Sequence, residues 1–128
     1  MRTLAREAVF KYIYSRLFNP SDEGLFDVLI KDFNDDDKNF AVQLKNHIIE
    51  NEQKYYDEME KLSIGYKINR IYTADKCALL VGFAEYNLFN STPKIVIIDE
   101  TVKLAAKYSS DNSPDFVNGI MASYTEVN

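Results

Sequence analysis

The sequence predicts an all-α fold, a compact bundle of about seven helices in a single domain over residues 1–128. Its apolar residues recur at helical spacing along most of the chain, and polar segments with Ser, Asn, Asp or Pro separate these stretches. Only 4 Gly and 3 Pro leave little room for the many tight turns of a β-sandwich or barrel. Hydrophobic residues make up 46% and charged residues 27%, an ordinary composition for a globular domain.

The first helix is expected over residues 3–18, with Thr3 as its cap and an end before Asn19-Pro20. One broad face of it is predicted to lie in the core, namely Ala5, Ala8, Val9, Tyr12, Ile13 and Leu17. A second helix is expected to follow residues 21–23 and to run through Phe33. Together these two helices form the expected N-terminal part of the bundle.

A third helix is expected to start after Asn34, because the acids at 35–37 suit the positive end of a helix dipole. It is predicted to break or bend near Asn51, before a shorter helix that ends at 62–63. Residues 64–66 then predict a turn, and residues 68–72 a brief helical piece.

The helix predicted from Thr73 to about Phe89 is apolar nearly all round, which is typical of the centre of a bundle. Residues 95–98 have strand propensity, yet the helical rhythm continues beyond them and a lone strand would have no partner. We therefore expect a helix over 94–108. The loop before Pro114 ends in a strong N-terminal cap, which predicts a last helix.

The net charge of −5 is unevenly distributed along the chain. Residues 1–20 hold four basic residues and one acid, a balance of +3, and residues 21–60 hold four basic residues and twelve acids, a balance of −8. Residues 61–128 hold seven of each. A basic terminus on an acidic body can bind a polyanion locally, but the charge alone favours the simpler interpretation of a short solvated helix that is rich in arginine.

The sequence offers little for catalysis, a metal or a cofactor, so a binding module is expected. His47, the only histidine, lies on the apolar face of an acidic helix and is predicted to be structural. Cys77 lies in the most apolar helix, where a thiol acts as a small hydrophobe. No stretch approaches the ~18 apolar residues of a membrane span, and the charged N-terminus does not look like a secretion signal. The cytoplasm is the expected location.

Two features of the first helix call for explanation. Arg6 stands among apolar residues, and an arginine held there by packing can present a fixed fork to phosphate. Tyr14 and Phe18 lie four residues apart on the outer face, where either another helix or a partner is expected to cover them.

A third feature is the segment 116–120 of the last helix. Gly119 costs about 1 kcal/mol relative to alanine inside a helix, so we expect another helix to approach closely there, with the Asn118 amide at that contact. Phe116 can stack on an unpaired base or can simply belong to the core.

The chain resembles the NusB family of bacterial transcription antitermination factors over its whole length. The resemblance rests on Ala5-Arg6-Glu7 leading to Tyr14, on Ile64 to Arg70-Ile71, on Glu85-Tyr86, on Val96-x-Ile98-Asp99-Glu100-x-Val102-x-Leu104-Ala105 with Tyr108, and on Phe116-Val117-Asn118-Gly119-Ile120. The last two motifs, after Pro93, are the most specific.

This resemblance implies an all-helical protein that binds the boxA element of ribosomal RNA leaders together with the ribosomal protein NusE. The pair joins the RNA polymerase antitermination complex and suppresses premature termination. By resemblance, Arg2 and Arg6 contact RNA, Phe116 lies at the RNA and Asn118 supports it. Tyr14 and Phe18 match positions that face NusE. We expect Arg6→Ala to weaken RNA binding without unfolding the chain.

Departures from the family pattern leave alternatives open. Thr3 and Leu4 stand where basic residues are common, and fewer cations imply weaker and less salt-dependent RNA binding. One alternative is a divergent NusB-like helical protein-interaction module that has lost sequence-specific RNA binding. Another is the helical RNA-binding domain that the family shares with certain RNA cytosine methyltransferases, which would require a longer protein. The outward rings would also serve a homodimer.

Overall fold

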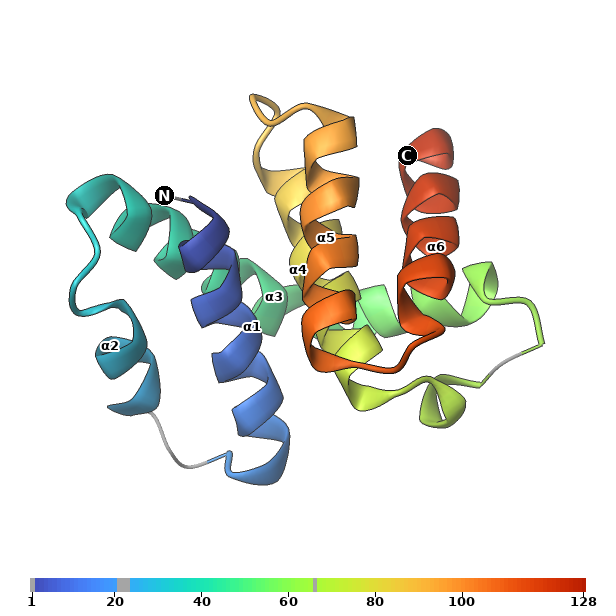
Figure 1. Cartoon of the computed structure of the whole chain (residues 1–128), viewed down its shortest axis with the longest axis horizontal. Helices are drawn as coiled ribbons and strands as arrows, with labels where there is room; N and C mark the ends of the chain where they lie inside the picture. The colour runs from blue at the N-terminus through green and yellow to red at the C-terminus, as the bar shows by residue number, and fades with distance from the viewer. Residues whose placement is uncertain (1, 21–23, 66) are drawn as a thin grey trace.

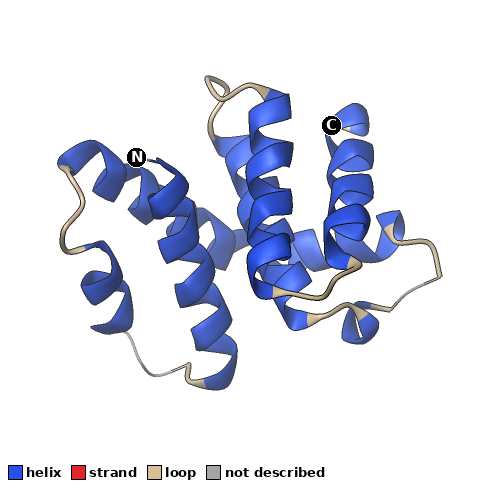
Figure 2. Cartoon of the chain, viewed as in Figure 1, coloured by secondary structure: helices blue, strands red, loops and turns tan. Residues whose placement is uncertain are grey.

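The computed structural model describes residues 2–20, 24–65 and 67–128, and all regular secondary structure within them is helical (Figures 1 and 2). The elements are α1 (Arg2–Phe18), α2 (Gly24–Ile30), α3 (Asp35–Leu62), the 3-10 helix η1 (Ile68–Arg70), α4 (Thr73–Leu88), α5 (Lys94–Tyr108) and α6 (Ser113–Val127). The predicted all-α bundle of about seven helices is therefore confirmed. None of the helices within these ranges is long and apolar enough to cross a bilayer.

The predicted break of the third helix near Asn51 was wrong, because α3 runs without interruption from Asp35 to Leu62. Its start is capped as expected, since the Asn34 side chain accepts a hydrogen bond of 2.8 Å from the backbone N–H of Asp37. At Asn51 the side-chain amide donates to the carbonyl of His47, 2.8 Å away and one turn earlier. The polar side chain is thus satisfied within the helix, and apolar residues on both sides of it remain in the core.

The segment with strand propensity, 95–98, is helical as predicted. Ile97 is 1% exposed, whereas Ile95 is 77% and Val96 40% exposed. A helix divides an apolar run between its two faces in this way, and only one of these three side chains is needed for the core. The second helix is shorter than expected, because it ends at Ile30 and Phe33 follows in a turn.

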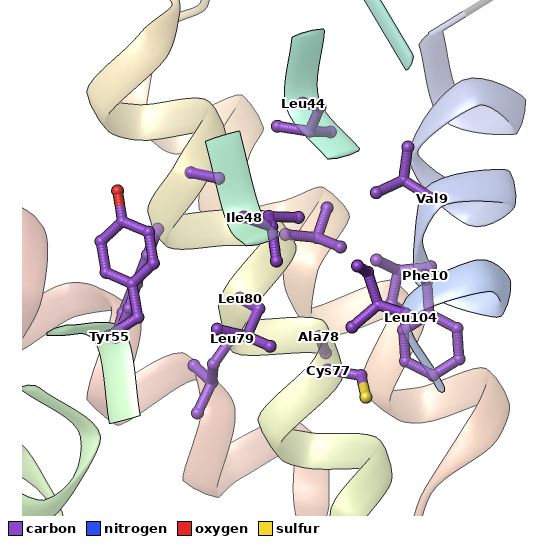
Figure 3. Packing of buried hydrophobic residues seen from close by; sticks show 14 of the residues in the cluster. Val9, Phe10, Leu44, Ile48, Tyr55, Cys77, Ala78, Leu79, Leu80 and Leu104 are labelled. Atoms are coloured by element: carbon purple, nitrogen blue, oxygen red, sulfur yellow. The ribbon is translucent and has the colours of Figure 1, made fainter. Parts of the chain in front are cut away.

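Helix α4 is the centre of the bundle, as its composition predicts. It packs against α1, α3, α5 and α6, while the long helix α3 runs behind both α1 and α4 (Figure 1). The central residues of α4 are completely buried and meet side chains of α1 and α3 in the core (Figure 3). Leu17 is an exception to the predicted core face of α1, because at the end of that helix it is 40% exposed.

The close helix approach lies at Gly82 of α4, and the prediction that placed it at Gly119 was wrong. A Cβ added to Gly82 would lie 2.5 Å from Thr101 Oγ1 of α5 and 2.8 Å from both Sδ and Cε of Met121 in α6. A Cβ added to Gly119 would meet nothing within 4 Å. Gly82 is therefore the residue that lets three helices come together, whereas Gly119 faces open space.

Candidate nucleic-acid and partner interface

Arg2 is exposed at the start of α1 and is held in place by two aromatic rings. Its guanidinium carbon lies 4.6 Å from the ring centroid of Phe40 in α3 and 5.5 Å from that of Phe89, which follows α4. A long hydrogen bond of 3.5 Å joins its Nη1 to Thr92 Oγ1. Cation–π contact and this tether orient an exposed cation without neutralising it, so Arg2 can still attract phosphate.

Arg6 lies in the core and not at the surface. It is 5% exposed, and its Nε and Nη2 donate to the two carboxylate oxygens of Glu85 in α4 at 2.6 and 2.7 Å, while Nη1 is 3.8 Å from Glu100 in α5. Burial acts to lower the pKa of Arg6, but the hydrogen bond and charge of Glu85, with the charge of Glu100, raise it. The guanidinium N–H groups that were expected to bind phosphate thus bind Glu85 instead. Arg6 therefore joins α1 to α4 inside the core.

Tyr14 and Phe18 point outward, as their helical positions predict. They are 37% and 69% exposed, and their ring centroids lie 5.2 Å apart. Tyr14 also stacks on Phe10, which in turn stacks on Tyr108 of α5 at 4.8 Å. These four rings, Phe10, Tyr14, Phe18 and Tyr108, form what we call the α1 aromatic patch.

The patch is part of a junction between α1 and α5. A hollow of about 290 Å³ is lined by Phe10, Lys11, Tyr14 and Tyr108. Beside it, Lys107 donates to Glu7 at 2.7 Å and so ties α5 to α1. The hollow thus joins the exposed ring of Tyr14 to the half-buried ring of Tyr108 and the buried ring of Phe10. An exposed aromatic surface backed by buried rings is typical of a protein-binding surface.

Phe116 and Asn118 lie at the start of α6 with different surroundings. Phe116 is half-buried and packs against the core, whereas Asn118 and the following Gly119 are exposed. Phe116 also lines a cavity of about 250 Å³ between η1, the start of α4 and the α5–α6 turn. Both the core interpretation of Phe116 and a place at a binding surface therefore fit its position.

The structure does not bring the predicted RNA-binding residues into one pocket. Arg2 lines a hollow that it shares with the acids Asp36 and Asp37 and with the amides of Asn39 and Gln43. Phe116 lines the separate cavity just described, and the two have no residue in common. An extended RNA strand can contact both hollows at once, whereas a compact ligand can occupy only one of them.

His47 and Cys77 have the structural roles that the sequence predicts. His47 Nε2 lies 2.7 Å from Tyr55 Oη, and burial lowers the pKa of this histidine. Asn87 joins the same cluster by donating to the hydroxyl oxygens of Tyr55 and Tyr124. Cys77 is completely buried, and burial raises the pKa of its thiol to about 12, which keeps it protonated.

Comparison with known proteins decides the family. The model of the NusB family matches residues 2–126 of the chain. The chain belongs to the NusB family. The transcription antitermination protein NusB of Alkaliphilus oremlandii is 31% identical over 131 residues, which cover 98% of this chain and 93% of that protein. The NusB of Natranaerobius thermophilus is 32% identical over 126 residues, which cover 94% and 91%.

Solved structures of NusB proteins have the same fold. NusB of T. maritima superposes with a TM-score of 0.92 at 25% identity and covers 98% of this chain and 91% of its own. A crystal structure of the antitermination factors NusB and NusE with double-stranded RNA gives a TM-score of 0.86 at 23% identity and covers 99% and 97%. At this identity the second likeness concerns the fold alone.

The NusB fold also places two residues at the Phe116 cavity that the sequence analysis did not single out. Asp75 in the first turn of α4 is only 3% exposed, and Arg70 of η1 lines the same cavity. One signal was available in the sequence: Asp75 stands one turn before the buried Ala78 and Leu79, so an acid occupies the apolar side of the helix.

Proposed function

We propose that this chain is a transcription antitermination factor that acts by binding boxA-type RNA in ribosomal RNA leaders together with the ribosomal protein NusE. It acts as one NusB-like domain over residues 1–128, in the cytoplasm, within the RNA polymerase antitermination complex. The observation that carries this proposal is the match to the NusB family over residues 2–126. The exposed α1 aromatic patch and the oriented cation Arg2 support it, because each supplies one of the two required surfaces.

NusE is assigned to the α1 aromatic patch. Phe18 is the most exposed ring of the patch, and Tyr14 joins it to rings anchored in the core. Large aromatic side chains supply most of the binding energy at typical protein interfaces. A homodimer through the same rings would compete with NusE for this surface.

RNA is assigned to the surface that runs from Arg2 to the start of α6, with Phe116 and Asn118 at the far end. Arg6 positions α1 against α4 through Glu85, so its effect on RNA is indirect. The alternative of a protein-interaction module without sequence-specific RNA binding is favoured by one observation. Of the three arginines of α1, Arg2 alone is exposed, because Arg6 is buried and Arg16 is half-buried and pairs with Glu52 at 2.8 Å.

The experiment that tests the function is a titration of labelled boxA-type RNA with the protein, alone and with NusE, at two salt concentrations. We expect salt-sensitive binding that NusE tightens and that exceeds binding to a scrambled RNA. Binding of NusE without any preference for boxA over the scrambled RNA would identify the chain as a protein-interaction module.

Arg2→Gln is expected to weaken RNA binding at every salt concentration and to reduce the slope of log K against log salt by about 1, because one phosphate contact is lost. Lys61→Gln is the matched control, since Lys61 is an exposed cation at the far end of α3, with 71% of its side chain accessible. Equal slopes for the two variants would remove Arg2 from the RNA surface. The measurement is fluorescence anisotropy.

Tyr14→Ala and Phe18→Ala are expected to weaken NusE binding by tenfold or more, because truncation of a central interface ring costs about 2 kcal/mol. Ile95→Ala is the control, because Ile95 is 77% exposed on α5 outside the patch. Calorimetric titration gives the affinities, and circular dichroism checks that helix content is kept. If both ring variants bind NusE as tightly as Ile95→Ala does, the partner surface lies elsewhere.

A further inference from the structure

Four hydrogen-bonding side chains form a continuous chain through the core where α3, α4 and α6 meet. His47 Nε2 and Tyr55 Oη, both on α3, lie 2.7 Å apart. The Asn87 amide of α4 donates to Tyr55 Oη at 3.0 Å and to Tyr124 Oη of α6 at 2.6 Å. The two tyrosines are almost completely buried, and Tyr55 is labelled in Figure 3. We call His47, Tyr55, Asn87 and Tyr124 the core polar network.

Apolar packing encloses the buried part of the network. Phe83 of α4 stacks on Tyr124 with ring centroids 4.0 Å apart and meets the Tyr55 ring edge-on at 5.6 Å. Phe83 is itself completely buried. A buried hydroxyl that loses its hydrogen-bond partner is destabilising, because the apolar surroundings offer no replacement. The three helices are therefore best joined when every hydrogen of the network has an acceptor.

The Asn87 amide fixes the direction of these hydrogen bonds. Its Nδ2 donates to the backbone carbonyl of Phe83 at 2.9 Å, which sets the orientation of the amide group. An amide nitrogen cannot accept, so the Tyr55 O–H is left to donate to His47 Nε2. Burial raises the pKa of Tyr55 to about 12, which keeps that O–H proton in place at neutral pH. His47 is therefore the acceptor, with a neutral imidazole whose proton is on Nδ1.

The charged groups that act on His47 lie on its own helix. Burial lowers the pKa of His47, the charge of Glu50 raises it and the charge of Lys54 lowers it. From α4 and α6 the network contains the neutral Asn87 amide and the Tyr124 hydroxyl, whose pKa is raised by burial. His47 is therefore the member of the network that can change its charge near neutral pH.

We propose that the core polar network is a proton-sensitive joint, which holds α3, α4 and α6 together while His47 is neutral and is weakened when acid protonates His47. A protonated Nε2 directs a second hydrogen at the Tyr55 hydroxyl, whose own hydrogen then has no acceptor in the network. The stabilisation is fully present above the pKa of an unfolded histidine, about 6.5, and is lost as the pH falls below it, because the unfolded chain then binds a proton that the folded chain resists. This inference is independent of RNA and NusE binding.

The first test is an NMR titration of His47, which is the only histidine in the chain, so its ring proton needs no assignment. The untagged chain is titrated from about pH 8 to about pH 4.5, once folded in buffer and once unfolded in urea, a range that brackets an ordinary histidine. The pKa of His47 is expected to be lower in the folded chain. Equal pKa values in the two states would overturn the joint, and this measurement needs no substitution.

Tyr55→Phe separates the effect of the hydroxyl from that of burial. It keeps the ring and removes the O–H that His47 accepts, so the pKa of His47 is expected to rise towards its value in the unfolded chain. Tyr56→Phe is the matched control, because the neighbouring half-buried ring loses the same hydroxyl but contacts Lys76 and not the network. It is expected to leave the pKa of His47 unchanged. If Tyr55→Phe also leaves this pKa unchanged, burial alone lowers it and the proposal is wrong.

The second test is the pH dependence of stability, measured by urea unfolding. His47→Gln is the reference, because it stays uncharged while the titration of the acidic residues is common to both chains. Between about pH 7.5 and about pH 5.5, the unfolding equilibrium constant of the natural chain is expected to rise by up to roughly tenfold more than that of His47→Gln, since an unfolded histidine is about tenfold more protonated than neutral at the lower pH. The same pH dependence in both chains would show that protonation of His47 does not weaken the folded structure, which contradicts the joint.

Discussion

Arg6→Ala is expected to lower the free energy of unfolding by about 3–5 kcal/mol, because it leaves the Glu85 carboxylate charged and unpaired in the core. Glu85 is 1% exposed, and both of its oxygens are bound by the Arg6 guanidinium in a two-point contact. Glu85→Ala is expected to cost a similar amount, since it leaves the guanidinium buried without its main partner. Urea unfolding followed by circular dichroism measures both.

The control is Arg16→Ala, which removes the arginine of an ion pair between α1 and α3. Arg16 and Glu52 also meet at 2.8 Å, but 27% and 23% of their side chains are accessible to water. A water-exposed ion pair contributes roughly 0–1 kcal/mol, so this variant should be nearly as stable as the natural chain. If Arg16→Ala and Arg6→Ala cost the same, burial is not what makes the Arg6–Glu85 pair important. Because Arg6→Ala is expected to be less stable than the natural chain, its RNA binding must be measured at a temperature where the variant is folded.

Most of the fold could be predicted from the sequence, because helix spacing and helix ends are local signals. The capped start at Asn34, the end of α1 before Asn19 and the outward position of Phe18 each depend on residues within a few positions. The predicted break at Asn51 was wrong because packing far from the local sequence signal decided the structure there. An asparagine lowers helix propensity locally, but burial of the apolar residues around it keeps α3 continuous through that point.

The site was less predictable, because its decisive features join residues far apart in the chain. Arg6 meets Glu85 across 79 positions, and no periodicity shows whether an arginine on an apolar face emerges into water or finds an acid. The burial of Asp75 in the Phe116 cavity is visible only once α4, η1 and the α5–α6 turn are assembled. The same dependence on distant residues applies to Gly82 and Gly119. Each glycine lowers helix propensity, and only the packing of neighbouring helices shows that Gly82 is the one required for a close helix approach.

Gly82→Ala is expected to lower the free energy of unfolding by about 1–3 kcal/mol, and Gly82→Val by more, because the new carbons overpack the contact of α4 with α5 and α6. Thr101 cannot move away easily, since its hydroxyl is buried and donates to the Ile97 carbonyl at 2.7 Å. Met121 is completely buried, so its flexible end has little free space to enter. These contacts outweigh the gain of about 1 kcal/mol in helix propensity that alanine brings. Urea unfolding measures the change.

Gly119→Ala provides the matched control with the opposite sign. A Cβ at Gly119 meets nothing within 4 Å, so the substitution is expected to raise the free energy of unfolding by up to about 1 kcal/mol through helix propensity alone. The two glycines lie in packed neighbouring helices and undergo the same chemical change, so the sign of the effect isolates the close helix approach. A stabilising Gly82→Ala would show that α4, α5 and α6 can move apart by the width of a methyl group at little cost. The central position of α4 would then depend on its buried side chains and not on Gly82.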